Sequence, residues 1–301
     1  MEIRELRYFV TIVEQSTFTA AAAKLHISQP SLSATIKKLE NKVGLSLLDR
    51  SARDIRLTKE GSILYYEARK LLNHFEHVLD EMERLKKDGP LDISIGLIES
   101  AKFWLPKVLC EFKKQYPNIH VKIFDLLSSH EVINSFNNYK IHLAITNQFI
   151  DNSEIKSIPI YEERLVALIP ESHNLTNKEY LTIHELETEA FIVCREGFQT
   201  REDILNTFRK AGIKPNLQFE IERFETACSL VENGLGITVV PENYVKNAPR
   251  YHFQIKQIQK PNNISRTVYL TMNKNRYLPP IVLTFIKLIK EQFPNTDIYE
   301  Q

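Results

Sequence analysis

The sequence predicts an α/β protein in two parts: a small helical module that leads into a long helix, and a larger domain of two lobes. Three observations predict this fold class. Apolar residues recur with helical spacing in the stretch before Asp88. Asp88-Gly89-Pro90 then interrupts the pattern and marks a domain boundary. After this break, short apolar runs alternate with amphipathic stretches, which is typical of parallel βαβ units.

Composition places the chain among ordinary soluble globular proteins. It has 301 residues, of which 43% are hydrophobic and 26% charged, so two or three domains are expected. The formal net charge is +1, so any contact with nucleic acid must come from a local basic patch. Three well-separated cysteines argue against a disulfide framework or a zinc site. The chain opens without a signal peptide and has no apolar run of membrane-spanning length, so we expect a cytoplasmic protein.

Three short helices are predicted at the start of the chain. The apolar stripe of the opening helix consists of Leu6, Phe9, Val10 and Val13. The second helix has a shared apolar face made of Phe18, Ala22 and Leu25. After a turn at His26-Ile27, Ser28 is a good N-cap and Pro30 suits a first helical turn. The third helix has a buried stripe made of Leu32, Ile36, Leu39 and Val43, and Gly44 ends it.

The opposite face of the third helix is polar and basic. It carries Gln29, Pro30, Ser31, Ser33, Ala34, Lys37 and Lys38. Short polar groups near the N-terminus can reach base edges while the lysines meet phosphate, so this face suits a helix in a DNA major groove. A surface helical hairpin is the alternative for a two-helix pattern alone.

A small β-hairpin, or wing, is predicted next. The apolar pieces Leu45–Leu48 and Ile55–Leu57 flank a charged turn with Arg50, Arg53 and Arg56 in or beside it. Seven lysines and arginines stand against four acidic residues from Gln29 to Glu60, a local net charge of +3. The arginines are therefore candidates for DNA phosphate or the minor groove, and three solvated side chains are the alternative.

A long helix follows, with Thr58 as its cap, and runs to Lys87. Its apolar residues are spaced alternately four and three apart, as in a heptad seam. They are Leu64, Ala68, Leu71, Phe75, Val78, Met82 and Leu85. A partner chain is the simplest cover for so long a seam, and packing on its own chain is the alternative.

Two α/β lobes are predicted after the break. The first has strands at 91–98, 120–127 and 141–146, with helices at 103–116 and 129–138. A strand at 163–170 leaves it for a second unit with strands at 191–194, 217–222 and 237–241 and helices at 201–211 and 226–233. A return crossover is expected near 259–266, before a strand at 267–272 and a helix at 279–293. The predicted domains are 1–60, 61–89 and 90–301, with lobe I at about 90–161 and 267–301 and lobe II at about 162–266.

Polar residues at strand ends and helix starts are candidates for a ligand site between the lobes. Ligands of open α/β sheets bind at these places. The candidates are Glu99, Ser100, Ser128, Ser129, Thr146, Asn147, Gln199, Thr200 and Thr226. Hydroxyls and helix N-termini favour a carboxylate or another anion, although Glu99 could repel it. Helix capping or turn formation is the alternative for each residue.

Several short sequence motifs are found together between Met1 and Gly61, and they carry a resemblance to a known family. They are Leu6-Arg7-Tyr8-Phe9, Phe18-Thr19-Ala20-Ala21-Ala22, Ile27-Ser28-Gln29-Pro30-Ser31-Leu32-Ser33, Ile36-Lys37-Lys38-Leu39-Glu40, Gly44-Leu45, Leu47-Leu48-Asp49-Arg50 and Leu57-Thr58. With them, the chain resembles a LysR-type transcriptional regulator over essentially its whole length, and the stretch from Val231 to Pro241 also fits. His142 stands where the family usually has aspartate, which could alter a contact at the lobe edge, and Leu48 stands where phenylalanine is commoner.

The resemblance implies a winged helix-turn-helix, a linker helix that pairs two subunits, and a two-lobed effector domain similar to periplasmic binding proteins. Family members usually form homotetramers built from two kinds of dimer. They bind promoter DNA, and a small molecule in the interlobe cleft changes DNA bending and the engagement of RNA polymerase. The resemblance implies a DNA-binding set of Thr19, Ser28, Gln29, Pro30, Ser31, Ser33, Ala34, Lys37, Lys38, Arg50 and Arg53. It also implies that five of the polar candidates face the cleft: Ser100, Ser128, Asn147, Thr200 and Thr226.

Three other classes of protein are alternatives. An enzyme is disfavoured because no HExxH, GxSxG, P-loop or dinucleotide-binding motif occurs, so no catalytic residue, cofactor or metal is expected. A stand-alone solute-binding protein would need a secretion signal and would lack residues 1–88. A thiol-based redox regulator of the same architecture is the remaining alternative, with Cys228, near a predicted helix start, as its only plausible thiol.

Overall fold

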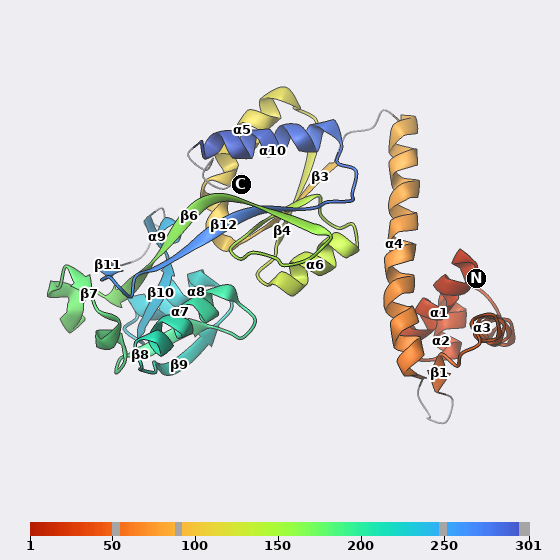
Figure 1. Cartoon of the computed structure of the whole chain (residues 1–301), viewed down its shortest axis with the longest axis horizontal. Coiled ribbons are helices and arrows are strands. Elements are labelled where there is room, and N and C mark those ends of the chain that lie inside the picture. The colour runs from red at the N-terminus through yellow and green to blue at the C-terminus, as the bar shows by residue number, and fades with distance from the viewer. Residues whose placement is uncertain (50–54, 88–91, 247–251, 295–301) are drawn as a thin grey trace. The chain divides into compact units, whose positions relative to one another are not determined.

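The computed structural model describes residues 1–49, 55–87, 92–246 and 252–294. These residues form two compact units, one that extends to Gly89 and one that contains nearly all the residues after it. Figure 1 shows the helices of the first unit and the strands of the second. Arg50 and Arg53 lie outside the described residues.

The first unit contains the helices and the wing that the sequence predicts. Its elements are α1 (Ile3–Gln15), α2 (Phe18–Lys24), α3 (Gln29–Val43), β1 (Leu48–Asp49), β2 (Arg56–Leu57) and α4 (Lys59–Lys87). Its core is formed by the predicted stripes, with Phe9 of α1 against Leu32 and Ile36 of α3. The strands β1 and β2 pair antiparallel and form the base of the wing.

Local residues set the ends of these helices. The Ser28 hydroxyl accepts a hydrogen bond from the Ser31 N–H at 3.4 Å and caps α3, and Gly44 ends α3 with φ of +71°. The Thr58 hydroxyl accepts from the Gly61 N–H at 2.9 Å and begins α4. At Gly61 a Cβ atom would lie 1.9 Å from the Leu47 carbonyl oxygen, so only glycine fits this contact between α4 and the wing.

The apolar seam of α4 is divided between two surroundings. Ala68 and Leu72 pack against α1, where they contact Leu6 and Val10, so the N-terminal part of the helix packs on its own chain. Further along, the seam is exposed at Leu71, Phe75, Val78 and Met82, with Phe75 at 37% and Met82 at 49%. The prediction that the small module would not cover the seam is therefore wrong for the first turns and confirmed for the later described ones.

The second unit has one continuous sheet path through both lobes. In lobe I, β3 (Asp92–Leu97) lies parallel to and between β4 (His120–Asp125) and β5 (Leu143–Thr146). In lobe II, β8 (Ala190–Cys194) lies parallel to and between β9 (Asn216–Ile221) and β10 (Ile237–Pro241). The covering helices are α5 (Leu105–Gln115), α6 (Ser129–Asn137), α7 (Gln199–Lys210), α8 (Phe224–Glu232) and α10 (Pro280–Gln292).

Two long antiparallel strands join the lobes, as Figure 1 shows. β6 (Ile155–Pro170) pairs with β12 (Ile264–Asn273) along lobe I and with β10 in lobe II. The two predicted crossovers are confirmed, but β6 begins before 163 because its first half pairs with β12. The remaining short elements were not predicted: η1 (Glu99–Phe103), η2 (Asn174–Asn177), β7 (Tyr180–Leu181), η3 (Ile183–Leu186), α9 (Glu242–Lys246) and β11 (Phe253–Ile258).

His142 is buried beside β3 in lobe I. The imidazole Nδ1 of His142 accepts the Ser94 main-chain N–H at 3.0 Å, and the His142 main-chain N–H donates to the Ser94 carbonyl at 2.8 Å. The departure from aspartate therefore places an imidazole acceptor on the backbone of the central strand.

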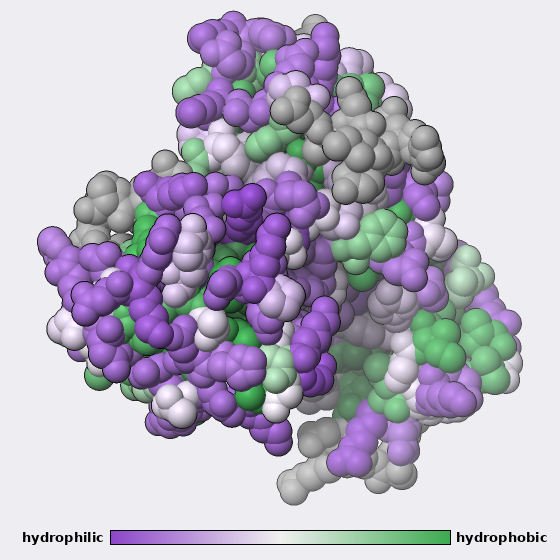
Figure 2. Space-filling model, turned by 60° about the vertical axis from the view of Figure 1, so that its left-hand side comes forward, coloured by the Kyte–Doolittle hydropathy of each residue, from purple (hydrophilic) through white to green (hydrophobic). Residues whose placement is uncertain are grey.

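One face of the protein is predominantly polar. Hydrophilic side chains cover most of the face shown in Figure 2, and hydrophobic ones form separate smaller patches. No helix within the described ranges is both long and apolar enough to span a bilayer.

Candidate functional site

The outer face of α3 is a polar and basic surface. Its exposed residues are Gln29, Pro30, Ser31, Ala34, Lys37 and Lys38, and Ser33 is half-buried. Neither lysine has an ion-pair partner among the described residues, so both charges are available to an external anion. The inner face of the same helix is held in the core by Leu32, Ile36 and Leu39.

Two carboxylates fix this helix to its neighbours. Glu5 of α1 accepts a hydrogen bond from the Lys42 ammonium at 2.6 Å, which holds the pKa of Glu5 below its ordinary value. Glu40 of α3 accepts the Leu47 N–H at 2.9 Å, immediately before the first strand of the wing. The polar face of α3 and the base of the wing therefore have a defined relation within this unit.

The other DNA-binding candidates differ in what their side chains do. Thr19 is exposed in the first turn of α2, whereas the Ser28 hydroxyl serves as the cap of α3. Arg56 is exposed on β2. The predictions for Arg50 and Arg53 fall outside the described residues and stay predictions.

A pocket in the second unit collects residues from both lobes. Five of its lining residues are predicted candidates: Glu99, Ser100, Asn147, Gln199 and Thr200. Five were not predicted: Ile98, Leu127, Phe198, Phe224 and Arg266. The space open to the centre of a water-sized molecule is only about 20 Å³, which suits roughly one water molecule. A metabolite can enter only if the lobes or side chains move apart.

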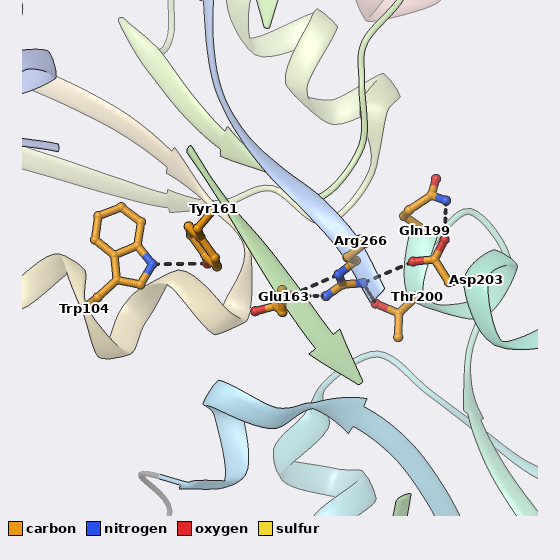
Figure 3. A network of polar contacts seen from close by, with 7 residues as sticks. All are labelled: Trp104, Tyr161, Glu163, Gln199, Thr200, Asp203 and Arg266. Atoms are coloured by element: carbon orange, nitrogen blue, oxygen red, sulfur yellow. Dashed lines mark hydrogen bonds and ion pairs between the residues drawn. The ribbon is translucent and has the colours of Figure 1, made fainter. Parts of the chain in front are cut away.

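Arg266 of β12 is the centre of the polar network in Figure 3. Its Nε and Nη2 donate to Glu163 Oε2 on the adjacent strand at 3.0 and 2.8 Å. Its Nη1 donates to the Thr200 hydroxyl oxygen at 2.7 Å and lies 3.5 Å from Asp203 on α7. Because Thr200 accepts this bond, its own hydroxyl proton can be donated to another group. The network ties the first turn of α7 to the two crossing strands.

Ser100 lies on the lobe I side of the pocket and is 1% exposed. Its hydroxyl is close enough to Tyr161 to lower the pKa of that phenol, but no described group makes a hydrogen bond of good geometry with Ser100 Oγ. Tyr161 itself accepts the Trp104 indole N–H at 3.2 Å, and burial raises the pKa of Tyr161, so it stays neutral. A buried hydroxyl without a good partner is costly, so Ser100 can gain from a ligand acceptor.

Glu99 connects the two lobes across the same pocket. Its Oε2 accepts the Phe224 N–H at 3.1 Å, at the first residue of α8. Burial raises the pKa of Glu99, and this main-chain bond partly opposes the rise. Beside it, Arg223 pairs with Asp125 at 2.6 Å, a second link between the lobes.

Four predicted candidates lie outside the pocket lining. Ser128 caps α6, since its hydroxyl accepts the Glu131 N–H at 3.3 Å, and Ser129 is the first residue of that helix. The Thr146 hydroxyl is buried within the sheet and contacts that of Thr271 at 3.0 Å. Thr226 is exposed on α8. Ser128 therefore matches the capping alternative, the Thr146 hydroxyl is used within the sheet, and neither Ser129 nor Thr226 lines the pocket.

Arg266 is the polar residue that sequence reasoning missed. It shares a strand face with Ile264 and Val268, both buried, and it lies opposite Glu163 in the strand register. A charged residue on the apolar face of a strand, in a segment predicted to cross between lobes, was the available signal.

The cysteines do not have the properties of a thiol switch. Cys228 is fully buried in the middle of α8, and burial raises its pKa to about 12. Cys194 is buried in β8 and its pKa is also raised to about 12, while Cys110 is exposed on α5. A reactive cysteine needs a lowered pKa and access, so the redox alternative is not favoured.

Comparison with known proteins gives consistent matches over the whole chain. A family model described as the LysR substrate binding domain matches residues 91–294, and one described as a bacterial regulatory helix-turn-helix protein, lysR family, matches residues 3–62. The chain is 29% identical to the uncharacterized HTH-type transcriptional regulator YybE of Bacillus subtilis (strain 168), covering 97% of this chain and 99% of that protein. It is also 29% identical to the transcriptional dual regulator GltC of the same organism, covering 100% of both. The crystal structure of CbnR, a LysR family transcriptional regulator, is similar in fold, with a TM-score of 0.70 at 21% identity, over 97% of this chain and 99% of that one.

Proposed function

The chain belongs to the LysR family of bacterial transcriptional regulators, and from this premise we propose which surfaces bind promoter DNA and effector. It is a DNA-binding regulator with a helix-turn-helix and an effector-binding domain. We propose that it acts in the cytoplasm as a regulator rather than as an enzyme. The proposed domains are 1–60 for DNA binding, 61–89 for the linker helix and 90–301 for effector binding.

The outer face of α3 is the proposed base-reading surface. Gln29 and Ser33 lie in the first turns of α3 and are proposed to face the bases. The amide side chain of Gln29 can pair with the donor and acceptor on an adenine edge. Lys37 and Lys38, which have no ion-pair partner in the described part of the chain, supply charges for phosphate. Thr19, the wing and its arginines would flank this helix on the duplex.

The pocket between the lobes is the proposed effector site. The observation that carries this proposal is that Ser100 of lobe I and Thr200 of lobe II line one pocket, each with a hydroxyl proton to offer. The first turn of α7 adds main-chain N–H groups, so the effector is proposed to carry a carboxylate. Ser128, Ser129, Thr146 and Thr226 are not part of this proposal.

The narrow pocket suggests how the effector acts on DNA. A ligand that fits only after the lobes shift stabilises the shifted arrangement by its difference in affinity. In a multi-subunit assembly, that shift would change how the DNA-binding units are spaced and how RNA polymerase is engaged. The exposed seam of α4 is the proposed dimer contact, with further effector-domain contacts that complete a homotetramer.

Footprinting of the upstream region of the gene itself, repeated with a panel of metabolic carboxylates, tests this function. The expected result is protection without ligand and an altered pattern with one panel member. Ser100→Ala should shift that response to higher ligand concentrations with basal protection intact, while Ser128→Ala, which alters only a helix cap, should retain the wild-type response. An unchanged response in Ser100→Ala would place the effector elsewhere.

Assembly is tested on the same protein by sedimentation. Phe75→Glu places a charge in the proposed α4 interface, where an unpaired carboxylate is strongly unfavourable. The expected result is a smaller species with much weaker operator binding. If the variant keeps the wild-type assembly, the dimer contact does not involve this part of α4.

A further inference from the structure

We propose that the effector is a zwitterion of the amino-acid type, with its carboxylate at the first turn of α7 and its protonated amino group at Glu99. This inference rests on the proposed function, because it takes the interlobe pocket as the effector site. It adds the chemical class of the ligand, which follows from how charge is distributed around the pocket.

The positive charge of the pocket is already balanced. Arg266 is the one cationic side chain among the described lining residues. Its guanidinium donates twice to Glu163, whose side chain is fully buried, and also faces Asp203. Two carboxylates thus share one arginine, which leaves no unpaired cation in the lining for a ligand that carries only negative charge.

Glu99 supplies a negative charge that the pocket does not balance. Glu99 is 8% exposed, and among the described residues its carboxylate accepts one hydrogen bond, from the Phe224 N–H to Oε2 at 3.1 Å. Lys102 and Arg223 attract the Glu99 charge, but both lie outside the pocket lining and have other partners. Arg223 pairs with Asp125, and the Lys102 ammonium lies 4.7 Å from the centre of the Tyr244 ring. A buried carboxylate with an open acceptor oxygen favours a cationic donor such as an ammonium group. A ligand with a carboxylate alone would meet repulsion here.

The opposite part of the lining offers donors. The N-cap position of α7, Phe198, has no side-chain cap, and the N–H groups of Gln199 and Thr200 have no acceptor among the described residues. Thr200 gives its oxygen to Arg266, so its proton is free to face a ligand. Ser100, which is buried and without a hydrogen bond of good geometry, adds an independent hydroxyl donor. Main-chain N–H groups and hydroxyls at a helix N-terminus together suit a carboxylate.

The pocket combines the Glu99 acceptor with the N–H and hydroxyl donors of α7 and Ser100. This combination favours a ligand whose positive and negative charges lie close together. An α-amino acid carries its ammonium and carboxylate on one carbon, so both ends can be satisfied without an unpaired charge. A simple carboxylic acid leaves Glu99 without a cation, and a simple amine leaves the α7 amides and Ser100 without an acceptor. The pocket should therefore discriminate by the amino group, not only by the carboxylate.

Calorimetric titration of the full-length protein tests this class. The probes are the protein amino acids and, for alanine, aspartate and glutamate, the matched acids without an amino group: propionate, succinate and glutarate. We expect at least one amino acid to bind, and its amino-free analogue, prepared where it is not in the panel, to bind at least about tenfold more weakly. Equal or tighter binding of the amino-free acid, or no binding by any amino acid, overturns the inference.

Two variants separate this inference from the proposed site. Glu99→Gln keeps the size and an acceptor for the Phe224 N–H but loses the charge, so the preference for the amino group should disappear. Glu185→Gln, which alters a carboxylate that caps η3 outside the pocket, should leave the preference intact. If amino-free acids bind best and Ser100→Ala weakens them, the site stands and only the ligand class is wrong. If amino acids bind equally well to Ser100→Ala, the proposed site itself is wrong.

Discussion

The proposed DNA-binding surface and the proposed effector pocket are built in different ways. The candidates on α3 lie within about three turns of one helix, so helical geometry alone puts them on one face. The pocket draws Ser100 from η1, Thr200 from α7 and Arg266 from β12, and two crossing strands bring these segments together. A surface on one helix needs only that helix and its support, whereas a convergent pocket depends on every segment that reaches it.

The difference also appears in how polar groups are used. On the outer face of α3, Lys37 and Lys38 are exposed and stay solvated, so replacing either should change the stability of the fold little. Beside the pocket, Arg266 and Glu163 form a buried ion pair. Removing either residue would leave the other charge buried without a partner, which is strongly destabilising. Single substitutions near the pocket should therefore change mainly the free energy of unfolding, whereas substitutions on the outer face of α3 should change mainly the affinity for DNA.

Arg266→Met should have the largest effect on stability. It leaves the Glu163 carboxylate buried without its cation, and breaking a buried pair costs about 3–5 kcal/mol. Trp104, the only tryptophan in the chain, lies in lobe I, so its fluorescence in urea reports the effector domain alone. Hydrogen exchange in α1 to α3 should be unchanged.

The double variant Arg266→Met with Glu163→Leu is the control for this substitution. Removing both charges should recover most of the lost stability, because no buried carboxylate is left unpaired. A single variant as stable as wild type would show that the network is not what holds α7 to the crossing strands.

Gln29→Ala should have the next largest effect, on binding instead of stability. Loss of a base-edge contact costs about 1–3 kcal/mol at the cognate site and little on unrelated DNA. Lys38→Gln is the matched comparison, since it should weaken both DNAs alike and reduce the salt slope by about 1. Fluorescence anisotropy at several salt concentrations measures both. A Gln29→Ala protein with unchanged sequence preference would mean that this face of α3 does not read bases.

The same contrast explains how much was predictable from sequence. The longer helices, the wing and most strands follow from local periodicity and turn residues and were predicted, whereas the first half of β6 and the short elements α9, β7 and β11 were not. In the pocket, the local rule that ligands lie at strand ends found Ser100 and Thr200, but it could not tell them from Ser128 and Thr146. The latter two use their hydroxyls in a cap and in the sheet, and only the tertiary structure decides this.

Arg266 was missed for a related reason. It is the third residue of β12, at the beginning of the strand and not at its carboxyl end. Its role depends on Glu163, which is far away in sequence but adjacent in register. Pairing between distant segments carries no local pattern in one sequence. A similar reason applies to α4, whose first turns pack on α1 although its heptad spacing continues without a break.

A pair of serine substitutions should separate a capping hydroxyl from a pocket hydroxyl. Ser128→Ala removes the cap of α6 and should cost about 1 kcal/mol of unfolding free energy. Ser100→Ala removes a buried hydroxyl that has no good partner, so it should cost nothing or stabilise slightly. Urea unfolding followed by Trp104 fluorescence compares them directly. A larger loss for Ser100→Ala would mean that its contact with Tyr161 is a real structural bond.

The smallest expected effect is a difference in the sign of the pH dependence between the two units. The pKa of Glu5 is lowered by its bond to Lys42, so the stability that it contributes is present above 4.5, its ordinary pKa, and is lost as the pH falls through the lowered value. The pKa of Glu99 is raised, chiefly by burial, so its contribution is present below 4.5 and is lost as the pH rises through the raised value.

Charge-removing variants should therefore have opposite effects at neutral pH. Glu5→Gln should destabilise the DNA-binding unit at pH 7, and the difference from wild type should shrink as the pH falls towards 4. Glu99→Gln should stabilise the effector domain at pH 7, because it removes the cost of keeping a charge buried, and this gain should also shrink towards pH 4. Hydrogen exchange in α1 to α3 follows the first variant, and Trp104 fluorescence follows the second. Destabilisation by Glu99→Gln at pH 7 would mean that the Glu99 charge on the N-terminus of α8 outweighs its burial, so the carboxylate would be a net contributor to lobe closure.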